Sequence, residues 1–269
     1  MTTSATGPAT AQRIPYGPHP DQWGELHLPG APGPAPLAAV VVVHGGYWRD
    51  RYTAELGTPV AEDLARHGLA AWNLEYRRAG SGGAPGAGGW PATFADVAAG
   101  IDHLAELAAA HSLDLSRVAL LGHSAGGHLA VWAAGRHRLP PGAPGAAPRV
   151  RPVGVVSQAG VLDLAAAHRL ALSDRAVENL LGGAPGELPG PYALADPMRA
   201  LPISTPVHAV HSRSDGAVPF ALSADYVEAA RRAGDPAELH ETGGDHFAVI
   251  TPGAQAHGLC RDLLLRLLR

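Results

Sequence analysis

Short apolar runs alternate along this chain with longer amphipathic stretches, and this alternation limits the fold more than any other feature. Residues 37–43 (LAAVVVV) are apolar on both faces, rich in β-branched side chains, and followed by His44-Gly45-Gly46. Such a run is typical of a strand buried inside a parallel sheet. Further segments with the pattern of strands are 69–76, 118–122, 153–157, 207–211 and the short 239–242.

Stretches with helical periodicity lie between these predicted strands. In residues 97–108 apolar side chains recur at spacings of four, three and four, which places them on one face of a helix. Residues 222–230 and 259–267 repeat an apolar residue every fourth position. Strands that alternate with helices predict an α/β fold, with a mostly parallel central sheet covered by helices on both faces.

The chain of 269 residues has a length that a single α/β domain often reaches. We predict a loosely ordered lead-in at residues 1–20, because they are polar and punctuated by Pro and Gly, and one domain at 21–269. The Gly-rich segment 78–90 is predicted to be a surface loop. Residues 159–201 carry short helical pieces and Gly/Pro breaks after a strand, so we expect a cap insertion there.

Composition excludes several classes of function. A formal net charge of −4 leaves no basic footprint for nucleic acid, and no apolar run approaches the ~20 residues of a membrane span. All 20 cationic residues are Arg, which excludes a phosphate-loop lysine, a lysine Schiff base and a Ser–Lys dyad. The single cysteine, Cys260, cannot form an intrachain disulfide, and residues 1–13 lack the pattern of a signal peptide. We therefore expect a cytoplasmic protein.

The motif G-x-S-x-G at 122–126 supplies a candidate nucleophile, Ser124. In a chain with 34 glycines the motif alone is weak, since a match is expected by chance in a fair share of such sequences. Its context is informative, because a predicted strand (118–121) enters it and a predicted helix (128–135) leaves it. That strand–turn–helix is what a nucleophile elbow requires, and small residues beside the serine permit its strained turn.

An acyl-transfer nucleophile also needs donors for the developing oxyanion. The segment HGGYW at 44–48 follows the first buried strand, where glycines let the backbone approach a carbonyl oxygen. We predict that the amides of Ala125 and Gly46 form the oxyanion hole, with Gly45 or Tyr47 as alternatives to Gly46. A plain strand-end turn is the simpler alternative for this glycine pair.

The acid and base are expected on loops after the last two strands. Asp215 follows the strand at 207–211, and His246 follows the strand at 239–242. The chain order Ser124, Asp215, His246 is that of α/β-hydrolases and differs from the chymotrypsin and subtilisin orders. Two other acids stay open as rivals to Asp215: Asp163, which follows the strand at 153–157, and Asp245, which is adjacent to the base.

No cofactor or metal is expected. The fifteen histidines include His123 and His128, but no carboxylate stands at ligand spacing from them, so we expect packing or surface roles. Cys260 is expected to pack as a small apolar side chain.

The motifs HGGYW, GHSAGGHLA, SDGAVP and GDHF resemble those of the α/β-hydrolase superfamily, from about Trp23 to the end of the chain. The likeness is to the esterase branch that includes kynurenine formamidases (arylformamidases) and hormone-sensitive-lipase-like esterases. Tyr47 favours the formamidase group, because lipase-like relatives more often have a third glycine there. The chain departs from its relatives at Ser212 and Asp245, where a glycine is usual.

The resemblance implies a serine hydrolase that cleaves a small carboxylic ester or an aryl formamide through an acyl-enzyme. Tyr47 and Trp48, beside the oxyanion turn, are candidates to contact an aryl group of the substrate. The alternative, that both residues wall the core beneath the cap, stays open. A prolyl-oligopeptidase-like peptidase and a non-catalytic binding module with this fold are the alternatives. The expected partner is a small molecule, with neither nucleic acid nor membrane, and a homodimer stays open.

Overall fold

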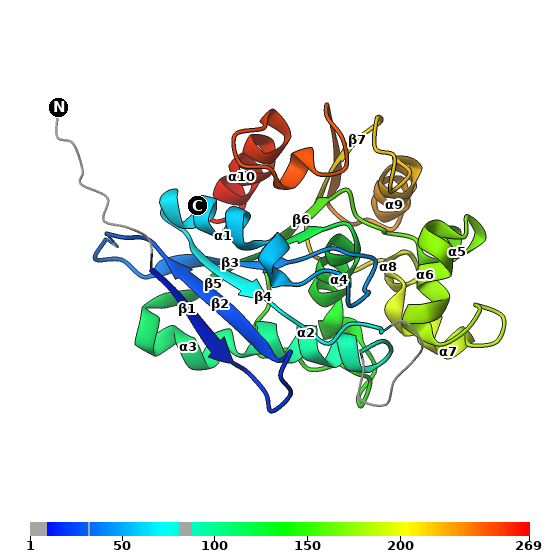
Figure 1. The fold of residues 1–269 in the computed structure, drawn as a ribbon, viewed down its shortest axis with the longest axis horizontal. Coiled ribbons are helices and arrows are strands. Elements are labelled where there is room, and N and C mark those ends of the chain that lie inside the picture. Colours follow the sequence, from blue (N-terminus) through cyan, green and yellow to red (C-terminus); the bar gives the residue numbers. More distant parts are fainter. Residues whose placement is uncertain (1–9, 32, 81–87) are drawn as a thin grey trace.

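A twisted sheet forms the centre of the computed structural model, which describes residues 10–31, 33–80 and 88–269 (Figure 1). Within these residues the sheet has eight strands in the order β1-β2-β4-β3-β5-β6-β7-β8. Their bounds are β1 Thr10–Pro15, β2 Trp23–Leu28, β3 Leu37–Val43, β4 Ala70–Leu74, β5 Leu113–His123, β6 Gly154–Gln158, β7 Val207–Ser212 and β8 Ala237–Thr242. In this order the strands from β4 to β8 are all parallel to their neighbours. Strand β2 is antiparallel to both of its neighbours, β1 and β4. The predicted α/β fold with a mostly parallel sheet is confirmed.

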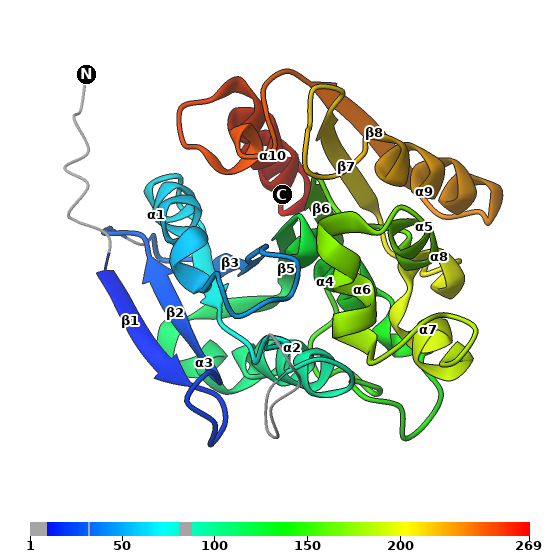
Figure 2. The same ribbon diagram turned by 45° about the vertical axis from the view of Figure 1, so that its right-hand side comes forward.

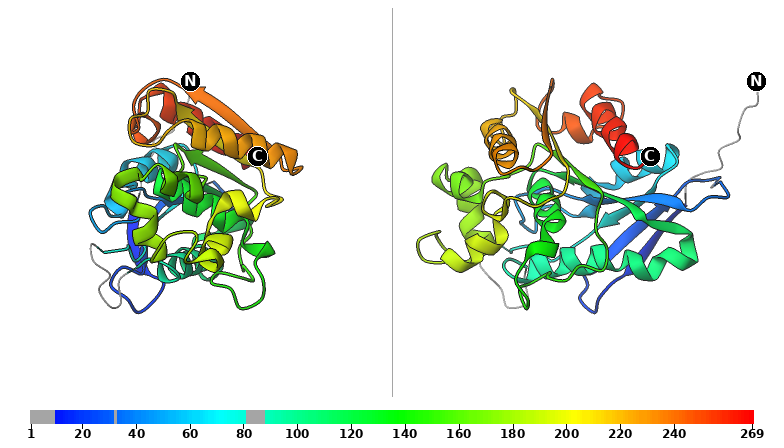
Figure 3. Two further views of the ribbon diagram at one scale, coloured as in Figure 1. Left: turned by 90° about the vertical axis from the view of Figure 1, so that its right-hand side faces the viewer. Right: turned by 180° about the vertical axis from the view of Figure 1, so that it is seen from behind.

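Helices cover both faces of the sheet (Figure 3). Alternate residues of β3 divide between two apolar cores, Val41 and Val43 on one face and Val40 and Val42 on the other. Helices α2 Ala92–Asp102, α3 Leu104–His111, α4 Ala125–Ala134 and α9 Ala221–Arg232 pack into the first core, and α1 Thr58–Arg66 and α10 Gln255–Leu267 into the second. Short 3-10 turns stand at Ala54–Leu56, Arg136–Arg138 and Ala248–Ile250. Cys260 is fully buried in the second core, as expected.

The start of the described chain differs from the expected lead-in. Residues 10–15 form the edge strand β1, which pairs with β2 from Thr10↔Leu28 to Pro15↔Trp23. An edge strand needs an apolar side chain on only one face, so its polar sequence gave no strand signal. Ile14 packs on the core and the Arg13 guanidinium lies 3.4 Å from the Trp23 ring centroid. Residues 1–9, and 81–87 of the predicted surface loop, lie outside the described part.

The segment 159–201 lies between β6 and β7 and forms four short helices beside the carboxyl end of the sheet (Figure 2). They are α5 Leu164–Arg169, α6 Leu172–Leu181, α7 Pro189–Ala195 and α8 Pro197–Ala200. Val177, Leu180 and Tyr192 are buried in the first core, so α6 and α7 pack on the same core as the sheet. No helix among the described residues is long and apolar enough to cross a membrane.

Candidate active site

A pocket of about 320 Å³ opens beside the ends of β3, β5, β7 and β8. The carboxyl ends of parallel strands meet at one edge of a sheet, and ligands bind at that edge in open α/β folds. Ser124 and His246 line the pocket, and so do Gly46 and Tyr47 of the predicted oxyanion turn. The topology therefore brings together three segments that the sequence analysis singled out separately.

Ser124 occupies the turn between β5 and α4 in a conformation that side chains rarely adopt. Its φ is 56° and its ψ is −119°, and it stands directly before the first residue of α4. The flanking glycines are needed because the backbone is crowded. A Cβ at Gly122 would lie 2.1 Å from the Gly126 carbonyl oxygen, and a Cβ at Gly126 would lie 2.0 Å from the Val43 carbonyl oxygen. The turn thus has the strained geometry of a nucleophile elbow.

This crowding predicts a large stability effect at Gly126. The change Gly126→Ala should destabilise the protein by about 3 kcal/mol. Neither the end of β3 at Val43 nor the start of α4 can move away from the new methyl group. In thermal unfolding this destabilisation corresponds to a Tm lower by about 6–12 °C. Gly190→Ala is the matched control, since a Cβ at Gly190 in α7 meets nothing within 4 Å. Equal Tm values for the two variants would contradict this account of the elbow.

His246 is held by Asp215. The His246 Nδ1–H donates to Asp215 Oδ2 over 2.6 Å, and the other carboxylate oxygen accepts the amides of Ala217 and Val218 at 2.8 and 2.9 Å. Burial would by itself raise the pKa of Asp215, but hydrogen bonds from His211, His246 and the Val218 amide hold it well below its ordinary value. Asp215 is therefore a carboxylate that fixes the orientation of the imidazole through its Nδ1 atom.

A second histidine on Asp215 escaped the sequence analysis. His211 Nε2 lies 3.1 Å from Asp215 Oδ2 and 3.1 Å from the Val218 carbonyl oxygen. Both atoms are acceptors, so Nε2 carries the proton and Nδ1 accepts the Ser223 hydroxyl at 2.8 Å. The side chain is fully buried. The sequence feature that could have indicated this contact is the position of His211 near the end of β7, four residues before Asp215.

His123, expected to be a packing or surface residue, lines the pocket and supports the His246 loop. Its Nε2–H donates to the His246 carbonyl oxygen over 3.0 Å, and the two ring centroids are 4.6 Å apart. Burial, aided by the charge of His246, lowers the pKa of His123 to about 3. His123 is therefore neutral and fixes the backbone that carries the base.

The predicted oxyanion turn lies against Ser124. A Cβ at Gly45 would come within 3.0 Å of the Ser124 Cβ, so glycine permits this approach. Gly46 has a φ of 117° and Tyr47 a φ of 51°, which turns the segment sharply. The Ala125 amide opens α4, where the first N–H groups have no partner inside the helix. The Tyr47 hydroxyl donates to the Ala217 carbonyl oxygen over 2.6 Å and joins this turn to the Asp215 loop.

The expectation that Trp48 contacts substrate is wrong in this structure. Trp48 is fully buried in the core, and its indole N–H donates to His128 Nδ1 over 3.1 Å. Both residues have a positive φ, 51° at Tyr47 and 58° at Trp48. Tyr47 alone of the pair lines the pocket.

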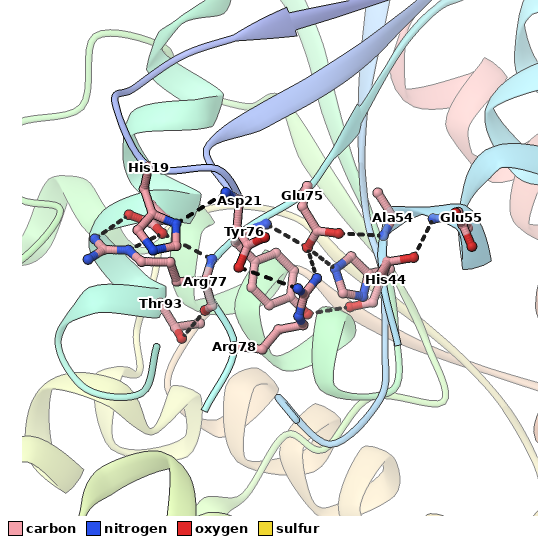
Figure 4. A network of polar contacts seen from close by, with 12 residues as sticks. His19, Asp21, His44, Ala54, Glu55, Glu75, Tyr76, Arg77, Arg78 and Thr93 are labelled. Carbon is pink, nitrogen blue, oxygen red and sulfur yellow. Dashed lines mark hydrogen bonds and ion pairs between the residues drawn. The ribbon is translucent and has the colours of Figure 1, made fainter. Parts of the chain in front are cut away.

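A buried polar network supports the turn from behind, as Figure 4 shows. His44 Nε2 lies 3.0 Å from Glu75 Oε1, and the Tyr76 ring stacks on His44 and donates its hydroxyl to the His44 carbonyl oxygen at 2.7 Å. Burial alone would raise the pKa of Glu75, but the His44 hydrogen bond and the charges of His44 and Arg78 hold it below its ordinary value. Glu75 also accepts the Ala54 amide, so one carboxylate ties three segments together.

The rival acids have other partners. Asp163 caps α5 by accepting the Ala166 amide at 2.7 Å. Asp245 accepts the amides of Phe247 and Ala248 at 3.0 and 3.1 Å, which closes a local turn beside the base. The contact to His246 Nδ1 is made by Asp215.

Fold and pocket together define a protein of the α/β-hydrolase class. Solved structures of this class match over nearly the whole chain. A truncated form of a carbohydrate esterase from gut microbiota is 20% identical, with a TM-score of 0.80 over 99% of this chain and 98% of that one. The BD-FAE family model matches residues 25–229, more than half of the chain, and the chain belongs to this family.

Two further structures show the same fold. A bacterial heroin esterase is 22% identical with a TM-score of 0.74, covering 97% of this chain and 85% of that one. The carboxylesterase Cest-2923 from Lactobacillus plantarum WCFS1 is 20% identical with a TM-score of 0.75, covering 97% and 98%. No curated protein sequence matches the chain. The α/β-hydrolase resemblance is thereby confirmed, and its formamidase part stays a prediction.

Proposed function

We propose that this protein is a serine hydrolase that cleaves a small carboxylic ester through an acyl-enzyme. The observation that carries the proposal is the 2.6 Å bond from His246 Nδ1 to Asp215, in a pocket that His246 shares with the strained Ser124. Under this proposal Ser124 is the nucleophile, His246 the base and Asp215 the orienting acid, the three roles that acyl transfer needs.

The proposed reaction follows from these positions. His246 Nε2 takes the proton from Ser124 Oγ as that oxygen attacks the ester carbonyl carbon. The amides of Ala125 and Gly46, with Gly45 or Tyr47 as alternatives to the latter, bind the oxyanion. His246 then gives its proton to the departing alkoxide, and a water activated by the same imidazole releases the acid and regenerates Ser124. Asp215 stabilises the imidazolium in both half-reactions.

The size of the pocket supports a small substrate. Its volume of about 320 Å³ is at the lower end of the range for small-molecule sites. The carbohydrate esterase, heroin esterase and carboxylesterase with similar folds support an ester rather than a peptide. An aryl formamide is the second candidate, supported by Tyr47 in HGGYW and by the position of its ring in the pocket wall.

The deciding experiment measures kcat/KM for p-nitrophenyl acetate and for N-formyl-kynurenine, in the natural protein and in Ser124→Ala. Ser124-dependent activity that favours the ester supports the proposal, and activity that favours the formamide replaces it with an arylformamidase. A folded protein that hydrolyses neither and does not react with a fluorophosphonate overturns it in favour of the binding-module alternative.

The segment 159–201 is proposed to act as a cap on this pocket. Ser173, in α6, lines the pocket, and the neighbouring Asp174 carbonyl oxygen accepts a bond from Arg49 Nη2 at 2.8 Å. Arg49 itself lines the pocket, so the cap holds a pocket-wall side chain in place. A substrate that extends beyond the acyl group would meet these residues.

The cationic side of the pocket predicts a charge preference. Arg49 and Arg51 line it, and no acidic side chain does so among the described residues. Arg49→Gln should lower the ratio of kcat/KM for 4-acetoxybenzoate to that for its methyl ester by about twofold to fivefold, the effect of one exposed ion pair. Arg213→Gln, on the exposed pair with Glu241 outside this pocket, is the control. A ratio unchanged in both Arg49→Gln and Arg51→Gln would contradict the preference.

A further inference from the structure

Three side chains with metal-binding chemistry meet on the two outer parallel strands, outside the pocket. They are His208 on β7 and Glu238 and His240 on β8. The strand register sets His208 opposite Glu238 and Val210 opposite His240. Side chains two residues apart share a face of a sheet, and Val210 is buried in the core under α10. The three side chains therefore project from the α10 face of the sheet.

The distances between their polar atoms match the distances between ligand atoms that bind one cation. His208 Nδ1 lies 3.1 Å from His240 Nε2 and 3.7 Å from Glu238 Oε2, and the last two atoms are 3.4 Å apart. Ligands of a tetrahedral zinc ion, at bond lengths of about 2.0–2.2 Å, are separated by about 3.3–3.6 Å. A point about 2 Å from all three atoms thus exists between them without movement of either strand.

We propose that His208, Glu238 and His240 bind a divalent transition-metal cation of the zinc type, through two imidazole nitrogens and one carboxylate oxygen. Water completes the coordination, since the Glu238 side chain is 60% exposed and leaves the site open to solvent. Imidazole ligands favour zinc, copper and nickel over magnesium and calcium. This is a new site on the chain, and it lies apart from His123 and His128, the histidines that the sequence analysis considered as ligands.

Burial lowers the pKa of His208 and that of His240, and the charge of Glu238 opposes this shift. Arg266 on α10 also lowers both pKa values. Arg266 should weaken the affinity without closing the site.

The site is separate from the proposed chemistry. His208 precedes Ser212, at the carboxyl end of β7, by four residues, or about 13 Å along the strand. A bound cation would clamp the edge strand β8 to β7, and β8 leads directly to the His246 loop. The proposal is therefore a structural clamp at the sheet edge, and it does not depend on the proposed hydrolase activity.

The test is a zinc titration of the tag-free, chelator-treated protein at pH 7.5, by competition with a chromophoric chelator. One equivalent should bind, and His208→Gln and His240→Gln should each weaken the affinity by at least about 10–100-fold, the loss that even an outer-shell partner causes. His111→Gln, at the end of α3 on another part of the molecule, should leave the affinity unchanged. Binding that survives both β-strand variants, or no binding below millimolar zinc, would overturn the proposal.

Two further readouts separate a metal site from a folding defect. Saturating zinc should raise the Tm of the natural protein by about 5–10 °C and leave that of His240→Gln unchanged, with both proteins compared before metal is added. Arg266→Gln should bind zinc about twofold to fivefold more tightly, because it removes a nearby exposed cation. If zinc raises the Tm of His240→Gln as much as that of the natural protein, the stabilising ion lies elsewhere and the assignment is wrong.

Discussion

Replacing Ser124 with alanine should lower kcat for p-nitrophenyl acetate by about 10⁶-fold, which is the loss found when a serine protease loses its nucleophile. Without Oγ no acyl-enzyme can form, and His246 has no hydroxyl to deprotonate. The residual rate should reflect only oxyanion binding and substrate orientation. Steady-state kinetics measure the loss, and labelling by a fluorophosphonate, counted by intact mass, should fall from one equivalent to none.

Ser173→Ala is the matched control for this variant. Ser173 lines the same pocket on α6 but is not placed in the proposed reaction. Its loss should leave labelling at one equivalent and change kcat by no more than a few-fold. If Ser124→Ala kept its label while Ser173→Ala lost it, the nucleophile would be on the cap and the elbow would have another role.

The change Asp215→Asn should lower kcat by about 10⁴-fold, as the same exchange does in a serine protease triad. An Asn side chain fits the same space, but its amide offers a donor as well as an acceptor and allows the wrong imidazole tautomer. The imidazolium of the transition state also loses its neighbouring negative charge. KM should change little, because Asp215 is buried and does not line the pocket.

The rival acids supply the controls for this prediction. Asp163→Asn and Asp245→Asn should each keep kcat within about tenfold of the natural protein, because these carboxylates accept local backbone amides. Asp163→Asn should lower stability by about 1 kcal/mol at most, since asparagine is also a good N-cap residue. A loss of 10⁴-fold in either rival, with Asp215→Asn active, would move the orienting role to that residue.

The sequence by itself determined the class of fold and the elbow. A buried strand such as 37–43 needs a continuous apolar run, and α10 needs an apolar residue at every fourth position. Both patterns can be read within one short segment of the chain. The elbow motif is local in part: the clash that demands Gly122 is with Gly126 in the same turn, whereas the clash that demands Gly126 is with Val43 at the end of β3. Asp215 and His246 could be proposed from their places after predicted strands, because parallel strands end at one edge of the sheet.

The tertiary structure alone decided which side chains meet. His123 reaches the His246 loop only through the sheet order β5-β6-β7-β8, which no spacing along the chain encodes. His211 lies four residues before Asp215 and contacts it, but the contact of Asp215 with His246 is set by tertiary packing. The same holds for Trp48, which is buried against His128, 80 residues further along the chain. His208 and His240 are 32 residues apart, and their nitrogens come within 3.1 Å because the register of β7 and β8 makes them diagonal neighbours on one face of the sheet. The spacing of apolar residues shows which face of a segment packs on the core. Which polar side chains come into contact is decided by strand register and by packing between segments that are distant in the sequence.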